Sequence, residues 1–202
     1  MSKNFNLIAI YGPSGCGKDT IKRAILKKDK FLFNNIIGVT TRPKREKEIN
    51  GKDYYFMNNE EFTENILNCN MMEATSFNGW FYGTLRTSLI LNKINIGIFN
   101  MEALQTLLED YEELNILPVW ISVNDKERLI RTLNREKNPN CTEICRRFIA
   151  DYNDYYIIPN SISVDNNEKG KVSENAEYII QYAKDYFNHK WLILFINFWI
   201  FL

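Results

Sequence analysis

Apolar positions along this chain follow two different patterns. Short apolar runs are typical of buried strands, and segments with an apolar residue every three or four positions are typical of helices. Strands are expected at 6–11, 36–39, 54–57, 71–76, 80–82, 95–99, 117–123 and 162–164. Helices are expected at 18–28, from 58 onward, and at 85–92, 101–109, 124–136, 142–153 and 173–188. Because strands and helices alternate, the pattern predicts an α/β fold with a parallel sheet flanked by helices.

The same pattern predicts how the chain is organised. Its length of 202 residues favours one domain over 1–202. The stretch 40–93 contains several short strands of its own and is interpreted as a lobe inserted into a core formed by 1–39 and 94–190. Asn58 followed by Glu61, and Asn124 followed by Glu127, have the spacing of capping boxes and predict where two helices begin.

The C-terminal segment 191–202, WLILFINFWIFL, is almost entirely apolar. Twelve residues are too few to span a bilayer, which takes about 20. Packing on the body of the protein or on a second subunit is therefore favoured over a peripheral membrane anchor. The N-terminal residues lack an apolar leader, so a cytoplasmic location is expected.

Composition excludes several classes of function. Lys and Arg number 25, as do Asp and Glu, so no net charge attracts nucleic acid, and any anion site must be local. The single histidine, His189, argues against catalytic schemes built on histidine. Four scattered cysteines without a CxxC pair predict neither a disulfide framework nor a zinc site.

Residues 12–18, GPSGCGK, lie between the first expected strand and the first expected helix. This GxxxxGK pattern in that context predicts a loop that binds the phosphates of a nucleotide. Glycines allow successive N–H groups to point at phosphate oxygens, and the lysine adds a positive charge. The expected ATP-binding residues are Gly12, Ser14, Gly15, Cys16, Gly17, Lys18, Asp19 and Thr20. Asp19 stands where the pattern usually has Ser or Thr, so Asp19 and Thr20 are the candidate Mg²⁺ ligands, either directly or through water.

Several later motifs occur in a fixed order. They are TTRPKR at 40–45, NGKDYYF at 50–56, Met72-Glu73-Ala74, and FYGT at 81–84. Together with the loop they resemble the guanylate kinase family, and the resemblance extends from about Leu7 to Phe148. The resemblance implies a P-loop fold with a lobe that binds a nucleoside monophosphate and a small lid at about 134–146.

The resemblance also implies roles for individual residues. The acceptor phosphate would be held by Arg42, Arg45, Tyr54 and Tyr82, while Glu73 would accept hydrogen bonds from guanine and Thr84 would contact its O6 side. Asn100 and Glu102 would contact the ribose or magnesium. The sequence departs from the family pattern at Gly38, where family members often have serine, and around Asn100, so the base and the sugar of the acceptor stay open.

Arginines flank the polar stretch 137–140 and would close over the triphosphate. They are Arg128, Arg131, Arg135, Arg146 and Arg147. Arg135 and Arg147 best match catalytic arginines alongside Lys18, and Arg131 and Arg146 are expected to bind ATP. A solvated basic helix face is the alternative interpretation, because Glu127 and Glu136 lie nearby in the sequence.

The expected function is phosphoryl transfer from ATP, with Mg²⁺, to GMP or dGMP. Two alternatives stay open at this point. One is a related kinase for another deoxynucleotide or a ribose bisphosphate, and the other is a non-catalytic guanylate-kinase-like binding module. The partners are expected to be small nucleotides, and the protein to be a monomer or a homodimer.

Overall fold

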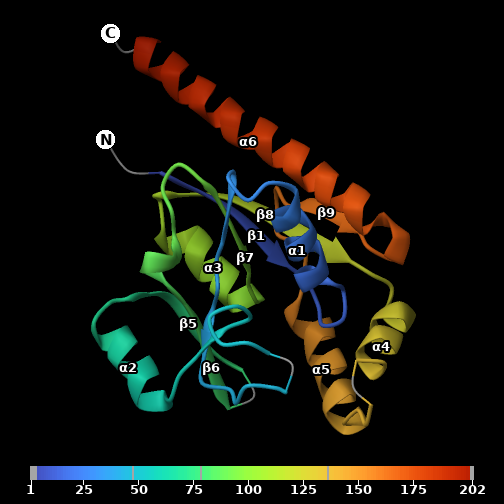
Figure 1. The fold of residues 1–202 in the computed structure, drawn as a ribbon. Helices are drawn as coiled ribbons and strands as arrows, with labels where there is room; N and C mark the ends of the chain where they lie inside the picture. The colour runs from blue at the N-terminus through green and yellow to red at the C-terminus, as the bar shows by residue number, and fades with distance from the viewer. Residues whose placement is uncertain (1–3, 47, 78, 136, 201–202) are drawn as a thin grey trace. The chain divides into compact units, whose positions relative to one another are not determined.

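The structure, a computed structural model, describes residues 4–46, 48–77, 79–135 and 137–200 (Figure 1). The chain divides into two compact units. The first unit comprises residues 1–9 and 30–116, and the second comprises 10–29 and 117–202. Two of the three boundaries fall inside strands, β1 (Phe5–Tyr11) and β8 (Leu114–Ser122), and the third lies between residues 29 and 30.

Five strands form a sheet in the order β2-β7-β1-β8-β9. In the first unit β2 (Phe33–Asn35) pairs parallel with β7 (Ile94–Ile98), and in the second β8 pairs parallel with β9 (Ile162–Asp165). Positions 7–11 of β1 are fully buried without alternation, as expected for a strand covered on both faces. The predicted α/β class with a parallel sheet is therefore confirmed.

The first unit also contains a second sheet, in the order β4-β3-β6-β5. Its strands are β3 (Val39–Thr40), β4 (Tyr55–Phe56), β5 (Met71–Phe77) and β6 (Trp80–Leu85). The helix α2 (Asn59–Leu67) contributes Phe62 to a core with Val39 and Met71. α3 (Met101–Asp110) contacts β5 within the same unit. This sheet lies almost entirely within the stretch in which the sequence predicted an inserted lobe.

Two predicted elements of the first unit are wrong. The expected strand 36–39 does not form, because β2 ends at Asn35 and Val39 starts the second sheet. The expected helix 85–92 is replaced by the end of β6 and a 3₁₀ turn, η1 (Arg86–Ser88). The side chain of Asn95 fixes this segment instead, because it bonds both the N–H and the C=O of Ile90, at 2.8 and 3.1 Å.

The second unit carries the remaining helices: α1 (Lys18–Lys28), α4 (Asp125–Leu133), α5 (Cys141–Asp154), the 3₁₀ turn η2 (Lys169–Lys171) and α6 (Val172–Ile200). α1 packs along α6 (Figure 1). Ile21 and Ile25 form the buried side of α1, and Ile179 and Ala183 are buried on α6. In α1, the buried Ile21 and Ile25 have the helical spacing from which the helix 18–28 was predicted.

α6 continues to Ile200, beyond the predicted end at 188, and no proline or glycine interrupts it. The side-chain packing of the apolar segment 191–202 lies outside the described residues. Among the residues that the structure describes, no helix is both long and apolar enough to cross a membrane.

Candidate functional site

The glycine-rich loop joins β1 to α1, as predicted. Gly12, Gly15 and Gly17 have φ values of 141°, 81° and 93°. Gly17 is the N-cap of α1 in the left-handed conformation, and a Cβ there would lie 2.5 Å from Nδ2 of Asn166. That Nδ2 donates to the carbonyl oxygen of Cys16 at 2.8 Å. Glycine is therefore required at position 17 both by the backbone and by the close approach of Asn166.

Lys18 is the first residue of α1, and its ammonium folds back over the loop. Nζ donates to the carbonyl oxygens of Gly12 at 2.6 Å and Pro13 at 3.0 Å. Burial lowers the pKa of Lys18, but nearby acidic groups, led by Cys16, outweigh it, so the pKa lies above its ordinary value. The ammonium is thus charged at neutral pH and held by neutral acceptors, which a phosphate can replace.

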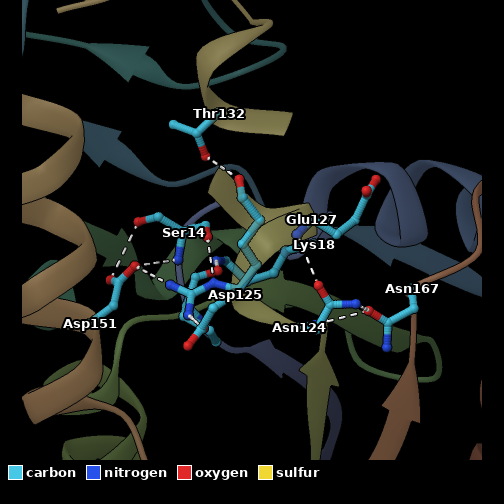
Figure 2. A network of polar contacts seen from close by, with 10 residues as sticks. Ser14, Lys18, Asn124, Asp125, Glu127, Thr132, Asp151 and Asn167 are labelled. Carbon is cyan, nitrogen blue, oxygen red and sulfur yellow. Dashed lines mark hydrogen bonds and ion pairs between the residues drawn. The ribbon is translucent and has the colours of Figure 1, made fainter. Parts of the chain in front are cut away.

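Ser14 of the loop is held by a buried ion pair between α4 and α5 (Figure 2). Its N–H donates to Oδ2 of Asp151 at 2.7 Å, and its hydroxyl approaches Oδ1 at 3.3 Å. Nη2 of Arg128 donates to Oδ2 of Asp151 at 3.0 Å, and Nε donates to the carbonyl oxygen of Ser14, also at 3.0 Å. Arg128 is therefore a buried anchor rather than an exposed cation, and Asp151 is a residue that the sequence did not reveal.

Arg131 is also engaged in the described structure. Nη2 donates to the carbonyl oxygens of Asn166 and Asn167, each at 2.9 Å, and Nε pairs with Glu127 at 2.8 Å. These bonds tie α4 to the segment after β9, beside the loop. A contact with ATP would require Arg131 to exchange at least one of them.

The other predicted lid arginines are more accessible. Arg135 follows α4 and is exposed. On α5, Arg146 and Arg147 both pair with Glu143, at 2.8 and 2.7 Å. Hydrogen bonds from Arg146 and then Arg147 lower the pKa of Glu143 to about 2. One carboxylate therefore holds the two arginines in place near the start of α5.

In the first unit, one guanidinium nitrogen of Arg42 pairs with both carboxylate oxygens of Glu48. Nη2 of Arg42 lies 2.8 and 3.0 Å from the two carboxylate oxygens. Glu48 also accepts a hydrogen bond from the backbone N–H of Arg45 at 2.8 Å. Nη1 of the Arg45 guanidinium lies 4.0 Å from Oε1 of Glu48. Burial raises the pKa of Glu48, but the hydrogen bonds and charges of Arg42 and Arg45 together lower it by more. The pKa therefore lies below its ordinary value. Glu48 therefore contacts both arginines that were predicted to bind phosphate, and the sequence did not single it out.

Aromatic rings surround Arg42 on the side of the second sheet. The guanidinium lies 5.8 Å from the ring centroid of Tyr54 and 5.6 Å from that of Phe56. The rings of Tyr54 and Tyr82 meet edge-on, with centroids 6.1 Å apart. The structure thus brings together Arg42, Arg45, Tyr54 and Tyr82, the residues predicted to hold the acceptor phosphate.

Glu73 and Thr84 face each other across β5 and β6. Both are buried, and the hydroxyl of Thr84 bonds the carboxyl of Glu73. Burial raises the pKa of Glu73 to about 7, against the lowering effect of Thr84, and Glu102 raises it further. A buried carboxyl with one hydroxyl partner can accept further hydrogen bonds, as a purine edge would offer.

Asn100 caps α3 next to this pair. Its Oδ1 accepts from the N–H of Ala103 at 2.8 Å, and its Nδ2 donates to Oγ1 of Thr75 at 2.9 Å. Glu102 is exposed in the first turn of α3. Thr75, two residues after Glu73 on β5, is a buried member of this cluster that the motifs did not indicate.

Gly38 has space for a side chain. A Cβ at this position would lie 3.4 Å from the carbonyl oxygen of Gly83 and 3.5 Å from Cε1 of Tyr54. These are ordinary van der Waals distances. The absence of a hydroxyl at position 38 is therefore a property of the sequence and is not imposed by crowding.

Asp19 and Thr20 are exposed in the first turn of α1, directly after Lys18. Mg²⁺ usually takes one or two protein ligands and completes its shell with water and phosphate oxygens. One carboxylate and one hydroxyl beside a phosphate loop fit that requirement. Among the described residues, no group of three or more His, Cys, Asp or Glu is placed to hold a metal by itself.

Comparisons with known proteins agree with this geometry. The family model described as guanylate kinase matches residues 4–183. A guanylate kinase of Clostridium tetani is 32% identical over 184 residues, covering 88% of this chain and 86% of that protein. A guanylate kinase of Lactobacillus delbrueckii subsp. bulgaricus is 45% identical over 78 residues, or 39% of this chain. That second match spans only 38% of the relative's length.

A solved structure shows the same fold. The guanylate kinase of Anaplasma phagocytophilum superposes with a TM-score of 0.67 at 20% identity, over 92% of this chain and 87% of that one. The chain belongs to the guanylate kinase family.

Proposed function

We propose that this protein transfers the γ-phosphoryl group of ATP to the phosphate of GMP or dGMP. The observation that carries the proposal is a charged Lys18 on a glycine-rich loop, in a chain that also groups Arg42, Tyr54 and Tyr82. Both arrangements are suited to phosphate, and each is built from its own set of residues. Family membership supports the same reaction.

On the ATP side, Lys18 would leave the carbonyl oxygens of Gly12 and Pro13 for the β- and γ-phosphates. The N–H groups around Gly15, Cys16 and Gly17 would donate to the same oxygens, strengthened by the positive end of the α1 dipole. Arg135, Arg146 and Arg147 would supply further positive charge on the transferring group. Such charge is the main contribution that a protein makes to phosphoryl transfer.

On the acceptor side, Arg42 would exchange the carboxylate of Glu48 for phosphate oxygens, since each anion presents a pair of oxygens that suits a guanidinium fork. Tyr54 and Tyr82 would add phenol donors. An oxygen of the acceptor phosphate then attacks the γ-phosphorus, a new P–O bond forms, and the bond to the β-phosphate oxygen breaks, releasing ADP. No covalent protein intermediate is needed.

Mg²⁺ would be held by Asp19 and Thr20, directly or through water. When bound, it would neutralise negative charge on the phosphate oxygens of ATP during the transfer.

Guanine would be read by Glu73 and Thr84. The carboxylate of Glu73 matches the two donors on the guanine edge, N1–H and the 2-amino group. Adenine lacks this pair and would leave buried carboxylate oxygens unpaired, which costs binding free energy.

A coupled assay that measures ADP release, with ATP and a panel of nucleoside and deoxynucleoside monophosphates, tests the proposal. We expect turnover with GMP or dGMP and little with AMP. Lys18→Ala should lower kcat by at least about a hundredfold, because one charged contact with the transferring group is lost. Lys27→Ala, on an exposed position of the same helix, is the matched control and should keep full activity.

Other results of this panel would replace the proposal. Turnover with a different deoxynucleotide or a ribose bisphosphate, but not with GMP or dGMP, would show a related kinase. The absence of ADP release with every acceptor would favour a non-catalytic binding module. A cytoplasmic location and a monomeric or homodimeric state remain predictions.

A further inference from the structure

Ser14 is held by the protein at three of its atoms. Asp151 accepts from its N–H and faces its hydroxyl, and Arg128 donates to its carbonyl oxygen. The two partners are bonded to each other and are buried, with 7% of Asp151 and 5% of Arg128 exposed. A residue in a glycine-rich loop is therefore fixed by a charged pair that comes from two helices.

The pair is itself tightly placed. Nη1 of Arg128 donates to Asp125 at 2.9 Å, and its guanidinium lies 4.6 Å from the ring centroid of Phe148 on α5. The backbone of Arg128 also approaches the loop, because a Cβ on Gly15 would lie 2.7 Å from its carbonyl oxygen. α4, α5 and the loop thus meet at one point, which Figure 2 shows around Ser14 and Asp151.

Asp151 also has a defined position relative to the lid arginines. It follows Arg147 on α5 by four residues, so both lie on the same face of the helix, about 6 Å apart along its axis. The hydrogen bond that Asp151 accepts from the N–H of Ser14 therefore ties the turn of α5 that follows Arg147 to the phosphate loop.

We propose that Asp151, acting through Ser14 and Arg128, is a positioning residue that holds the phosphate loop in its binding conformation and sets Arg147 beside it. The inference rests on the proposed function and deepens it, because it assigns the alignment of the ATP site to a carboxylate that does not touch ATP. It concerns ATP alone, since every residue involved lies in the second unit.

The test compares Asp151→Asn and Asp151→Glu with the unsubstituted protein. Asparagine keeps an oxygen for the Ser14 N–H but loses the charge that pairs with Arg128, and glutamate keeps the charge on a longer side chain. Asp154→Asn, the same change at an exposed position of α5, is the control. Affinity for ATP alone is measured by isothermal titration, and kcat and the KM for GMP by the coupled assay.

We expect Asp151→Asn to weaken ATP binding by about tenfold or more and to lower kcat, because a charge-assisted hydrogen bond is lost. The KM for GMP should stay within about twofold, and Asp154→Asn should match the unsubstituted protein. Asp151→Glu should fold and recover part of the ATP affinity.

Equal ATP affinity and kcat in Asp151→Asn and the unsubstituted protein would overturn the inference. A parallel loss of ATP and GMP binding, with a lower Tm, would also overturn it, because that result describes a structural role. If Asp151→Asn does not fold, Asp151→Glu decides by the same measurements, and failure of both to fold counts against positioning. An unsubstituted protein that binds ATP but leaves GMP unphosphorylated would instead refute the proposed function, which separates the two failures.

Discussion

Glu73 is a buried carboxyl whose ionisation departs strongly from its behaviour in water. Its pKa is raised to about 7, chiefly by burial. The folded protein therefore binds a proton between about pH 4.5 and 7 that the unfolded chain releases, so this carboxyl stabilises the fold below that range and the stabilisation is lost as the pH rises through it. The effect on the free energy of unfolding is about 3 kcal/mol at most.

The same ionisation predicts how guanine binding depends on pH. Only the carboxylate form of Glu73 can accept from both donors of guanine, so the KM for GMP should fall as the pH rises toward about 7 and then level off. Below the pKa, the KM should rise by up to about tenfold per pH unit. Initial rates at varied GMP, with ATP saturating, from pH 5.5 to 8.5 measure this.

Glu73→Gln is the control for that profile. It should raise the KM for GMP at neutral pH and remove most of the dependence on pH, because no ionisable group is left at the position. An unchanged profile in Glu73→Gln would assign the pH dependence to another group.

Motifs identified the residues expected to touch nucleotide, and missed those that hold them. Lys18, Arg42 and Glu73 stand in patterns with a known spacing, so the sequence alone singled them out. Glu48 and Asp151 carry no such pattern. Each is recognised only once folding brings its carboxylate to an arginine, in the case of Asp151 one that is 23 residues away in the chain.

At the scale of helices and strands, local signals were the most reliable. α2 begins where the sequence predicted, and both halves of the capping box form. The side chain of Asn58 accepts from the N–H of Glu61 at 2.8 Å, and the backbone N–H of Asn58 donates to the carboxylate of Glu61 at 3.0 Å. α4 has the predicted N-cap, Asn124, although the carboxylate of Glu127 pairs with Arg131.

The capping box predicts a measurable contribution to stability. Asn58→Ala should lower the free energy of unfolding by about 1 kcal/mol, because the N–H of Glu61 loses its acceptor at the end of the helix. Chemical denaturation, followed by circular dichroism, measures the shift in midpoint. Asn59→Ala changes the same residue type one position later, inside the helix, and should have little effect; equal losses in the two variants would contradict the capping argument.

Elements that depend on distant partners were predicted less well. Ile36 and Val39 are both buried, as their apolar character indicated, but Ile36 bonds to Ile96 of β7 while Val39 pairs with Gly83 of β6. Hydrophobicity reports burial and does not report which sheet a residue joins. The segment after β6 was mistaken for a helix for a similar reason, since Asn95 fixes it from outside the local sequence.

For the whole molecule, several short motifs in a fixed order were enough to predict the family. The family predicted from the phosphate loop and the four later motifs is confirmed by the match over residues 4–183. Net charge excluded a general attraction for polyanions. At the two sites the cations have local partners: Lys18 has backbone carbonyls, Arg42 has Glu48 and Arg147 has Glu143.

The division into two units predicts that the two nucleotides stabilise the protein through separate residues. ATP alone and GMP alone should each raise Tm, by roughly 5 °C or more at about 100 times Kd. Arg42→Met should remove the shift caused by GMP and keep that caused by ATP, and Lys18→Ala should do the reverse. Thermal unfolding of the three proteins with each ligand measures this, and loss of both shifts in either variant would refute it.

The ion pair between Nη2 of Arg42 and both carboxylate oxygens of Glu48 would set a threshold for an acceptor phosphate that binds to Arg42 as proposed. A ligand must offer more to the guanidinium than a carboxylate that is already in place, so binding is an exchange of one anion for another. A terminal phosphate ester, with close to two negative charges, can win that competition. A cyclic nucleotide or a phosphodiester, with one charge spread over its oxygens, is at a disadvantage even when its base is guanine. With Arg42 in its proposed role, the pair with Glu48 would favour terminal phosphates over internal ones, whatever the base.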